Sequence, residues 1–140
     1  MIKKVIVLLF FIHSFSYSSD YINTNRWFTK QQVMIGKDLF VKNCSVCHGN
    51  KAEKTLNWKK TLSDGSYPPP PLNGSAHTWH HPKSQLISII KNGGELYDGN
   101  MPGFDSVLTN SDIENVIAYF QNFWDDEKYY LWLESGGLTR

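Results

Sequence analysis

The stretch Cys44-Ser45-Val46-Cys47-His48 determines how the rest of this sequence is interpreted. The pattern C-x-x-C-H is typical of covalent haem attachment. Two thiols three residues apart on a helical turn can each add to one vinyl group of a haem, and the next residue then presents its imidazole to the iron. The motif therefore predicts one haem c, bound through Cys44 and Cys47 by thioether bonds and ligated by His48.

Other uses of a closely spaced cysteine pair have to be weighed against haem attachment. A thioredoxin-like dithiol also uses C-x-x-C, but it belongs in a βαβ unit, and no strand alternation of useful length occurs here. A zinc site usually takes its four ligands from paired motifs, and the chain has no second cysteine pair. A disulfide across this gap would close a tiny loop and add little stability. The motif thus favours haem over a dithiol or zinc.

A haem iron held by one histidine needs a sixth ligand or has an open site. Met101 is the best candidate, because it lies in Gly99-Asn100-Met101-Pro102-Gly103-Phe104, between two predicted helices. A thioether ligand stabilises ferrous iron and raises the reduction potential. Met34 lies on a predicted helix and fits the ordinary role of filling a core. We therefore predict that the metal ligands are His48 and Met101.

The spacing of apolar residues predicts an all-α domain, with helices joined by long loops wrapped around the haem. Thr29 and Gln32 form a capping box for a first helix that runs into Cys44. Pro82 suits the first turn of a second helix, which Gly93 can terminate.

A last helix is predicted from Thr109, with Asp112 three positions on, and the pattern allows its continuation past Trp124 toward Leu133. The long segment 49–81 lacks periodicity and contains four consecutive prolines, so it is predicted as a loop that packs on the cofactor.

The N-terminus has the pattern of a secretory signal. Lys3 and Lys4 precede an apolar run over residues 5–12, and Ser16 and Ser18 supply a small-x-small cleavage pattern. We predict a cleaved signal peptide over residues 1–18 and an exported, periplasmic protein. An uncleaved segment that anchors the chain in a membrane is the alternative.

The charge of the chain argues against a nucleic-acid partner. The formal net charge is only +1, so no bulk basic field is present. Five lysines nevertheless flank the cysteine pair and could steer an acidic redox partner, although they could equally form a solvated charge run; they are Lys42, Lys51, Lys54, Lys59 and Lys60.

The sequence resembles the class I monohaem cytochrome c family over about residues 31–124. The resemblance rests on the C-x-x-C-H motif, on Met101-Pro102, and on Pro70-Pro71-Leu72-Asn73-Gly74, which is similar to the family's P-x-L-x-G stretch. It implies a cytochrome c domain over 29–124, followed by a C-terminal extension over 125–140. It also implies that the carbonyl of Pro70 accepts a hydrogen bond from His48 and so tunes the iron.

Further helix positions resemble the same family. The small residue Gly36 would let the last helix cross closely, and Val116 and Tyr119 occupy matching positions on that helix.

The stretch His77-Thr78-Trp79-His80-His81 departs from the simplest family pattern. It can be a polar loop over the haem, with Trp79 or a histidine donating to a propionate. Alternatively, His77, His80 and His81 could hold a second metal, copper or zinc, or one of them could replace Met101 on the iron.

Together these features predict a protein that carries single electrons between redox partners and is not itself an enzyme. No small-molecule substrate is evident, and no hydrolytic Ser-His-Asp arrangement is recognisable. Three alternatives remain open: a gas-binding or catalytic haem protein with a weak sixth ligand, a copper-handling module, and a subunit of a larger oxidoreductase.

Overall fold

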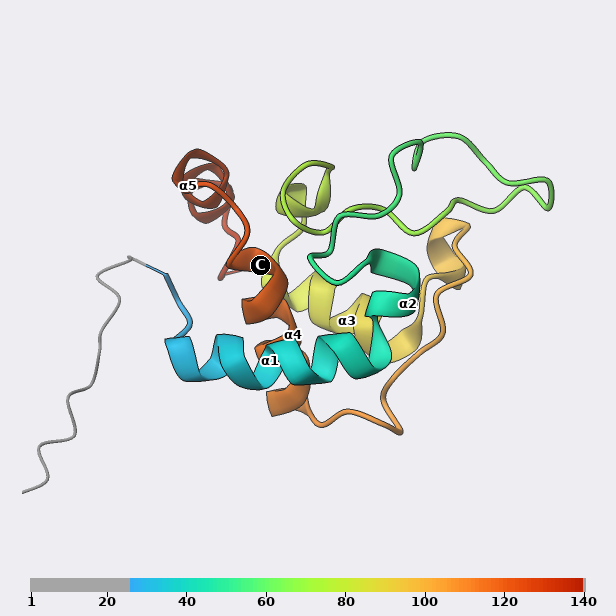
Figure 1. Cartoon of the computed structure of the whole chain (residues 1–140). Coiled ribbons are helices and arrows are strands. Elements are labelled where there is room, and N and C mark those ends of the chain that lie inside the picture. Colours follow the sequence, from blue (N-terminus) through green and yellow to red (C-terminus); the bar gives the residue numbers. More distant parts are fainter. Residues whose placement is uncertain (1–25, 140) are drawn as a thin grey trace, which may run out of the picture.

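The computed structural model describes residues 26–139, which form an all-helical domain (Figure 1). The described part of the chain contains no β-strand, only an isolated bridge between Tyr67 and Gly99. The predicted all-α class is therefore confirmed. The helical elements, in chain order, are α1 (Lys30–Asn43), α2 (Ser45–His48), η1 (Thr78–His80), α3 (Lys83–Asn92), η2 (Glu95–Tyr97), α4 (Asn110–Gln121) and α5 (Asp126–Glu134).

The predicted helix starts agree closely with the structure. Thr29 accepts a hydrogen bond from the backbone N–H of Gln32 and forms the expected capping box at α1. Thr109 and Asp112 form a second capping box at α4. Helix α3 differs by one position, because Pro82 is extended (φ −66°, ψ 157°) and caps the helix instead of forming its first turn.

Helices α1 and α4 cross at Gly36 (Figure 1). A Cβ atom at Gly36 would lie 1.8 Å from the carbonyl oxygen of Asn115 and 3.1 Å from the Cβ of Tyr119. The close crossing expected from a small residue here is confirmed. It brings the inner face of α1, with Phe40 fully buried, against Ile113 and Val116 of α4.

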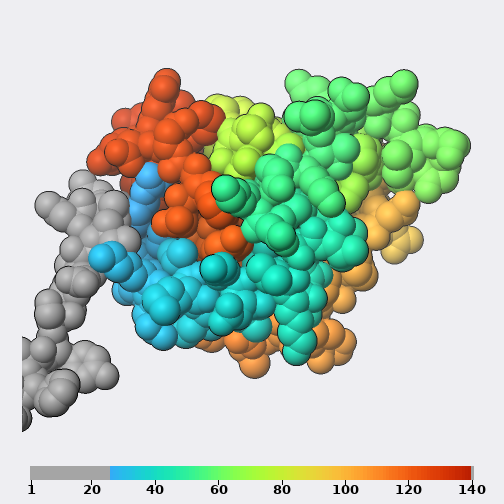
Figure 2. Space-filling view, in the orientation of Figure 1, coloured from blue at the N-terminus to red at the C-terminus, as the bar shows by residue number. Residues whose placement is uncertain are grey.

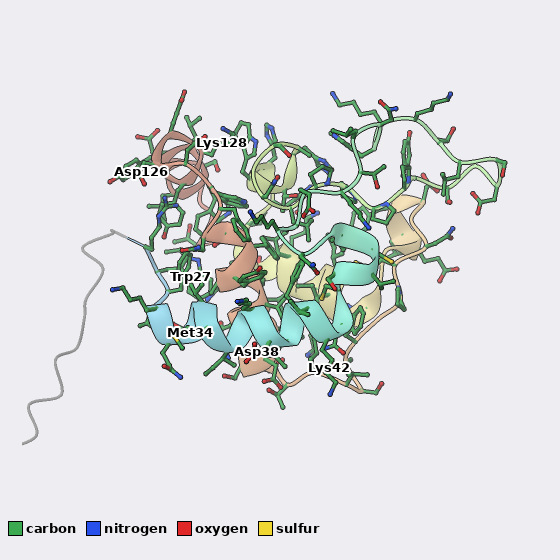
Figure 3. The ribbon with its side chains drawn as sticks, in the orientation of Figure 1. Trp27, Met34, Asp38, Lys42, Asp126 and Lys128 are labelled. Carbon is green, nitrogen blue, oxygen red and sulfur yellow. The ribbon has the colours of Figure 1, made fainter. Side chains whose placement is uncertain are left out.

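The outer face of α1 is exposed. Met34, Asp38 and Lys42 lie along it in Figure 3. Met34 is 64% exposed, so its interpretation as a core-filling residue was wrong.

The last predicted helix does not continue past Trp124. Helix α4 ends at Gln121, and Asp125 is extended (φ −63°, ψ 165°), with its side chain accepting from the N–H of Lys128. This carboxylate caps a separate helix, α5. Residues Tyr129 and Trp132 of α5 are buried in the same hydrophobic cluster as Phe40, so the C-terminal segment packs on the core.

The segment before α1 also packs against α5 and the end of α4. The guanidinium of Arg26 lies 4.1 Å from the ring centroid of Tyr129, whose hydroxyl accepts from the N–H of Trp27 at 2.7 Å. The indole of Trp27, labelled in Figure 3, donates to Gln121 Oε1 at 2.6 Å. The two ends of the described chain are therefore joined by partly buried polar contacts.

The predicted signal peptide, residues 1–18, lies outside the described residues. Within residues 26–139, no helix combines the length and apolar character needed to cross a bilayer.

Candidate haem site

The cysteine pair lies on a single helical turn. The backbone bends at Cys44 (φ −120°, ψ −30°), where α1 gives way to the short α2. The N–H groups of Cys47 and His48 both bond to the carbonyl of Cys44, at 3.1 and 2.9 Å. Neither cysteine forms a disulfide. Both thiols are therefore free for attachment to a ligand.

The two thiols differ in their surroundings. Cys44 is buried, whereas Cys47 is exposed. Burial, with a smaller contribution from Cys47, raises the pKa of the Cys44 thiol to about 11. Ionisation of the Cys44 thiol is therefore even less favourable than that of an ordinary cysteine.

His48 is buried, and its Nδ1 lies 2.9 Å from the carbonyl oxygen of Pro70. A carbonyl can only accept, so Nδ1 carries the proton and the lone pair of the neutral ring is on Nε2. Burial lowers the pKa of His48, against an opposing effect of the Pro70 bond. A neutral imidazole with a free lone pair is the form that binds a metal. The bond between His48 and Pro70 is also the contact that the family resemblance implied.

Pro70 belongs to a segment held by other side chains. The hydroxyl of Thr78 donates to the carbonyl of Pro71 at 3.1 Å, and the indole of Trp124 donates to the carbonyl of Leu72 at 2.8 Å. The sequence interpretation assigned no role to Thr78 or Trp124. The proline run was the available signal, since it lacks N–H donors and can form backbone hydrogen bonds only through its carbonyl groups.

The loop that carries Met101 is fixed to the end of α3. The N–H of Gly94 bonds to the carbonyl of Met101 at 2.9 Å, and a Cβ at Gly93 would lie 2.7 Å from that same oxygen. On the other side of the loop, the carbonyl of Asp98 accepts a hydrogen bond from the N–H of Tyr67 at 2.8 Å. Met101 is partly buried against the hydrophobic cluster that includes Cys44.

The histidine-rich stretch does not form a metal site. The ring of His77 stacks on Trp58 at 4.5 Å, His80 stacks on Trp79 at 3.8 Å, and His81 meets His77 edge to face at 5.1 Å. Within residues 26–139 no three His, Cys, Asp or Glu side chains are grouped to hold a metal ion. The alternative of a second metal at His77, His80 and His81 is not supported, because these rings pack against aromatic neighbours.

The five lysines that flank the motif are all exposed, and none forms an ion pair with another residue of the described chain. The segment of residues 42–60 that carries them is coloured teal to green in Figure 2 and forms part of the visible face. The ammonium of Lys59 lies 5.3 Å from the ring of Trp58. These charges are available to a partner.

A helical domain with a C-x-x-C-H turn and a histidine bonded to a proline carbonyl is the hallmark of a monohaem c-type cytochrome. Residues 31–120 match the family model described as cytochrome c oxidase, cbb3-type, subunit III. Since this match covers more than half of the chain, the protein belongs to that family of c-type cytochrome domains.

Several characterised proteins are similar to this chain. Cytochrome c6 of Synechocystis is 33% identical over 84 residues, which cover 60% of this chain and 59% of the relative. The cbb3-type cytochrome c oxidase subunit FixP of Azorhizobium caulinodans is 30% identical over 92 residues, covering 62% of this chain and 28% of FixP.

A third relative is the cytochrome c subunit of the quinone alcohol dehydrogenase of Gluconacetobacter polyoxogenes, 25% identical over 99 residues, which cover 66% of this chain and 19% of that subunit. The chain thus spans between a fifth and three fifths of the length of these relatives. No solved structure matches the chain significantly.

Proposed function

We propose that this protein is an exported monohaem cytochrome c that carries single electrons between redox partners. The observation that carries this proposal is the buried His48, bonded to Pro70 at 2.9 Å and placed directly after two free cysteines on one turn. Cytochrome c family membership implies haem c and electron transfer.

The residues present fit a covalently attached haem. Cys44 and Cys47 would form the two thioether bonds, and His48 would be the proximal ligand through Nε2. The attached group would supply a one-electron ferric–ferrous couple. The chain's own contribution is to fix the imidazole with Pro70 and to exclude water with the surrounding apolar core.

Met101 would be the sixth ligand. Backbone hydrogen bonds from the N–H groups of Gly94 and Tyr67 fix the loop that carries it. The backbone at Met101 therefore has a defined position. A closed coordination shell of one histidine and one methionine changes little between oxidation states and leaves no site for dioxygen. This favours electron transfer over gas binding or catalysis.

Export and docking complete the proposal. The signal pattern of residues 1–18 would direct the chain to the periplasm, where covalent haem proteins function. The exposed lysines, including Lys42, Lys51 and Lys54, would attract an acidic partner and raise the rate of encounter at low ionic strength.

A second candidate is a cytochrome subunit of a larger oxidoreductase. It is favoured by two relatives, one a subunit of an alcohol dehydrogenase and the other a subunit of a cbb3-type oxidase. The chemistry of the chain would be the same in both cases. Purification from the native source under mild conditions separates them, since a carrier elutes alone and a subunit elutes with its complex.

Haem attachment is tested by the paired variant Cys44→Ala and Cys47→Ala. We expect the exported wild-type protein to retain haem after denaturation and acid-acetone extraction, and the paired variant to lose it. Val46→Ala, between the cysteines and 82% exposed, is the matched control and should retain haem. Haem that resists extraction from the paired variant would refute the attachment.

A further inference from the structure

The segment that binds His48 cannot be fixed by its own donors. Residues 68–71 are consecutive prolines, and proline has no backbone N–H. Such a segment can form backbone hydrogen bonds only through its carbonyl groups, and the buried ones need donors from elsewhere. The N–H of Leu72, the first after the prolines, bonds to the carbonyl of Ala52 at 2.8 Å and fixes one end.

Three consecutive carbonyl groups of this segment each accept a bond from one side chain. The carbonyl of Pro70 accepts from the imidazole of His48 at 2.9 Å. The carbonyl of Pro71 accepts from the hydroxyl of Thr78 at 3.1 Å. The carbonyl of Leu72 accepts from the indole N–H of Trp124 at 2.8 Å. Thr78 and Trp124 are only 3% and 2% exposed. Buried bonds of this kind resist competition from water, and their loss leaves a polar group unpaired.

We propose that Thr78 and Trp124 are positioning residues that hold the Pro70 carbonyl on His48 and thereby set the reduction potential. This inference rests on the proposed function, because it concerns the ligand that would bind the haem iron. Neither residue would need to touch the cofactor, because Thr78 acts through the backbone of Pro71 and Trp124 acts through that of Leu72.

Helix α5 supports both positioning residues. The indole of Trp132 donates to the carbonyl of His81 at 2.8 Å, at the end of the turn that carries Thr78. The same indole lies edge to face on Trp124, with ring centroids 5.9 Å apart and an interplanar angle of 81°. Trp132 thus connects the histidine-rich stretch, whose role the sequence left open, and the C-terminal segment to the backbone that holds His48.

The effect on the iron follows from the strength of the His48 bond. A firm bond from Nδ1–H to a carbonyl makes the imidazole a stronger electron donor, which favours ferric iron. If the carbonyl of Pro70 moves away from His48, that bond weakens and ferrous iron becomes more stable relative to ferric iron. Loss of the Thr78 hydroxyl is therefore expected to raise the midpoint potential and to speed hydrogen exchange at His48 Nδ1.

The test uses Thr78→Val, which keeps the shape of the side chain and removes its donor. We expect this variant of the haem-bound protein to show a higher potential and faster Nδ1 exchange by NMR, and Thr78→Ser to restore both. Thr61→Val, at an exposed position of the same loop, is the matched control and should match the wild type. If Thr78→Val does not fold, Trp124→Phe decides, since it keeps a ring and loses the donor to Leu72.

The outcomes separate this inference from the proposed function. A wild-type protein without covalent haem would overturn the proposed function itself. A wild-type cytochrome whose potential and Nδ1 exchange are unchanged in Thr78→Val, or in Trp124→Phe where that variant decides, would overturn only the positioning role. An equal shift in Thr78→Val and Thr78→Ser would also overturn it, because the effect would then not depend on the hydroxyl.

Discussion

Helix α1 approaches α4 so closely at Gly36 that any side chain there should be costly. In Gly36→Ala the new Cβ would lie 1.8 Å from the oxygen and 2.5 Å from the carbon of the Asn115 carbonyl. These are backbone atoms of a helix, so no rotamer change relieves the contact and the helices must separate. Overpacking of this kind costs about 3 kcal/mol, at the upper end of the usual range.

Part of that cost is offset, because alanine is favoured over glycine within a helix by about 1 kcal/mol. The expected net loss of unfolding free energy is therefore about 2 kcal/mol, a large share of a total stability of about 5–15 kcal/mol. With a urea m-value of about 2 kcal/mol/M, the unfolding midpoint of the haem-bound protein should fall by about 1 M.

Lys37→Ala changes the neighbouring exposed position of the same helix and is the matched control, with a midpoint close to that of the wild type. A Gly36→Ala protein as stable as the wild type would refute the close crossing of α1 and α4.

Three further predictions concern the ligand, the C-terminal helix and a helix cap. Met101→Ala should keep its covalent haem but bind carbon monoxide in the reduced state; a variant with unchanged spectrum and potential would exclude Met101 as ligand. Trp132→Phe should lower the unfolding free energy by about 2 kcal/mol, since it loses a buried bond and leaves a cavity; an unchanged urea midpoint would contradict this. The hydroxyl and N–H of Thr109 lower the pKa of Asp112, so Asp112→Asn should be less stable than the wild type above the ordinary carboxyl pKa of 3.8. This difference in unfolding free energy between the two proteins should vanish as the pH falls through the lowered pKa of Asp112. A difference between their urea midpoints that does not change with pH would contradict this prediction.

Local sequence signals predicted the helix starts, and the family resemblance implied the contact of His48 with Pro70. The capping residues Thr29 and Thr109 act on their own first turns, and this information is present within four residues. The expected contact between His48 and Pro70 depended on the family resemblance, because the two are 22 residues apart.

The parts that the sequence did not predict depend on contacts between distant residues. Nothing local marks Trp124 as a donor to Leu72, 52 positions earlier, or Trp132 as a donor to His81. The separate helix α5 begins because Asp125 is extended and caps it, whereas the apolar spacing alone allowed one continuous helix. The second metal is not supported, because three histidines that are close in sequence form no group that could hold a metal ion within the described residues.

The proposal of a covalent haem held by His48 and Met101 is tested most directly by an optical spectrum of the purified protein in its oxidised and reduced forms. We expect a c-type spectrum in the reduced protein and, in the oxidised protein, the weak near-infrared band of a sulfur-to-iron bond. A haem spectrum without that band would contradict the assignment of Met101, and a purified protein without haem would contradict the account as a whole.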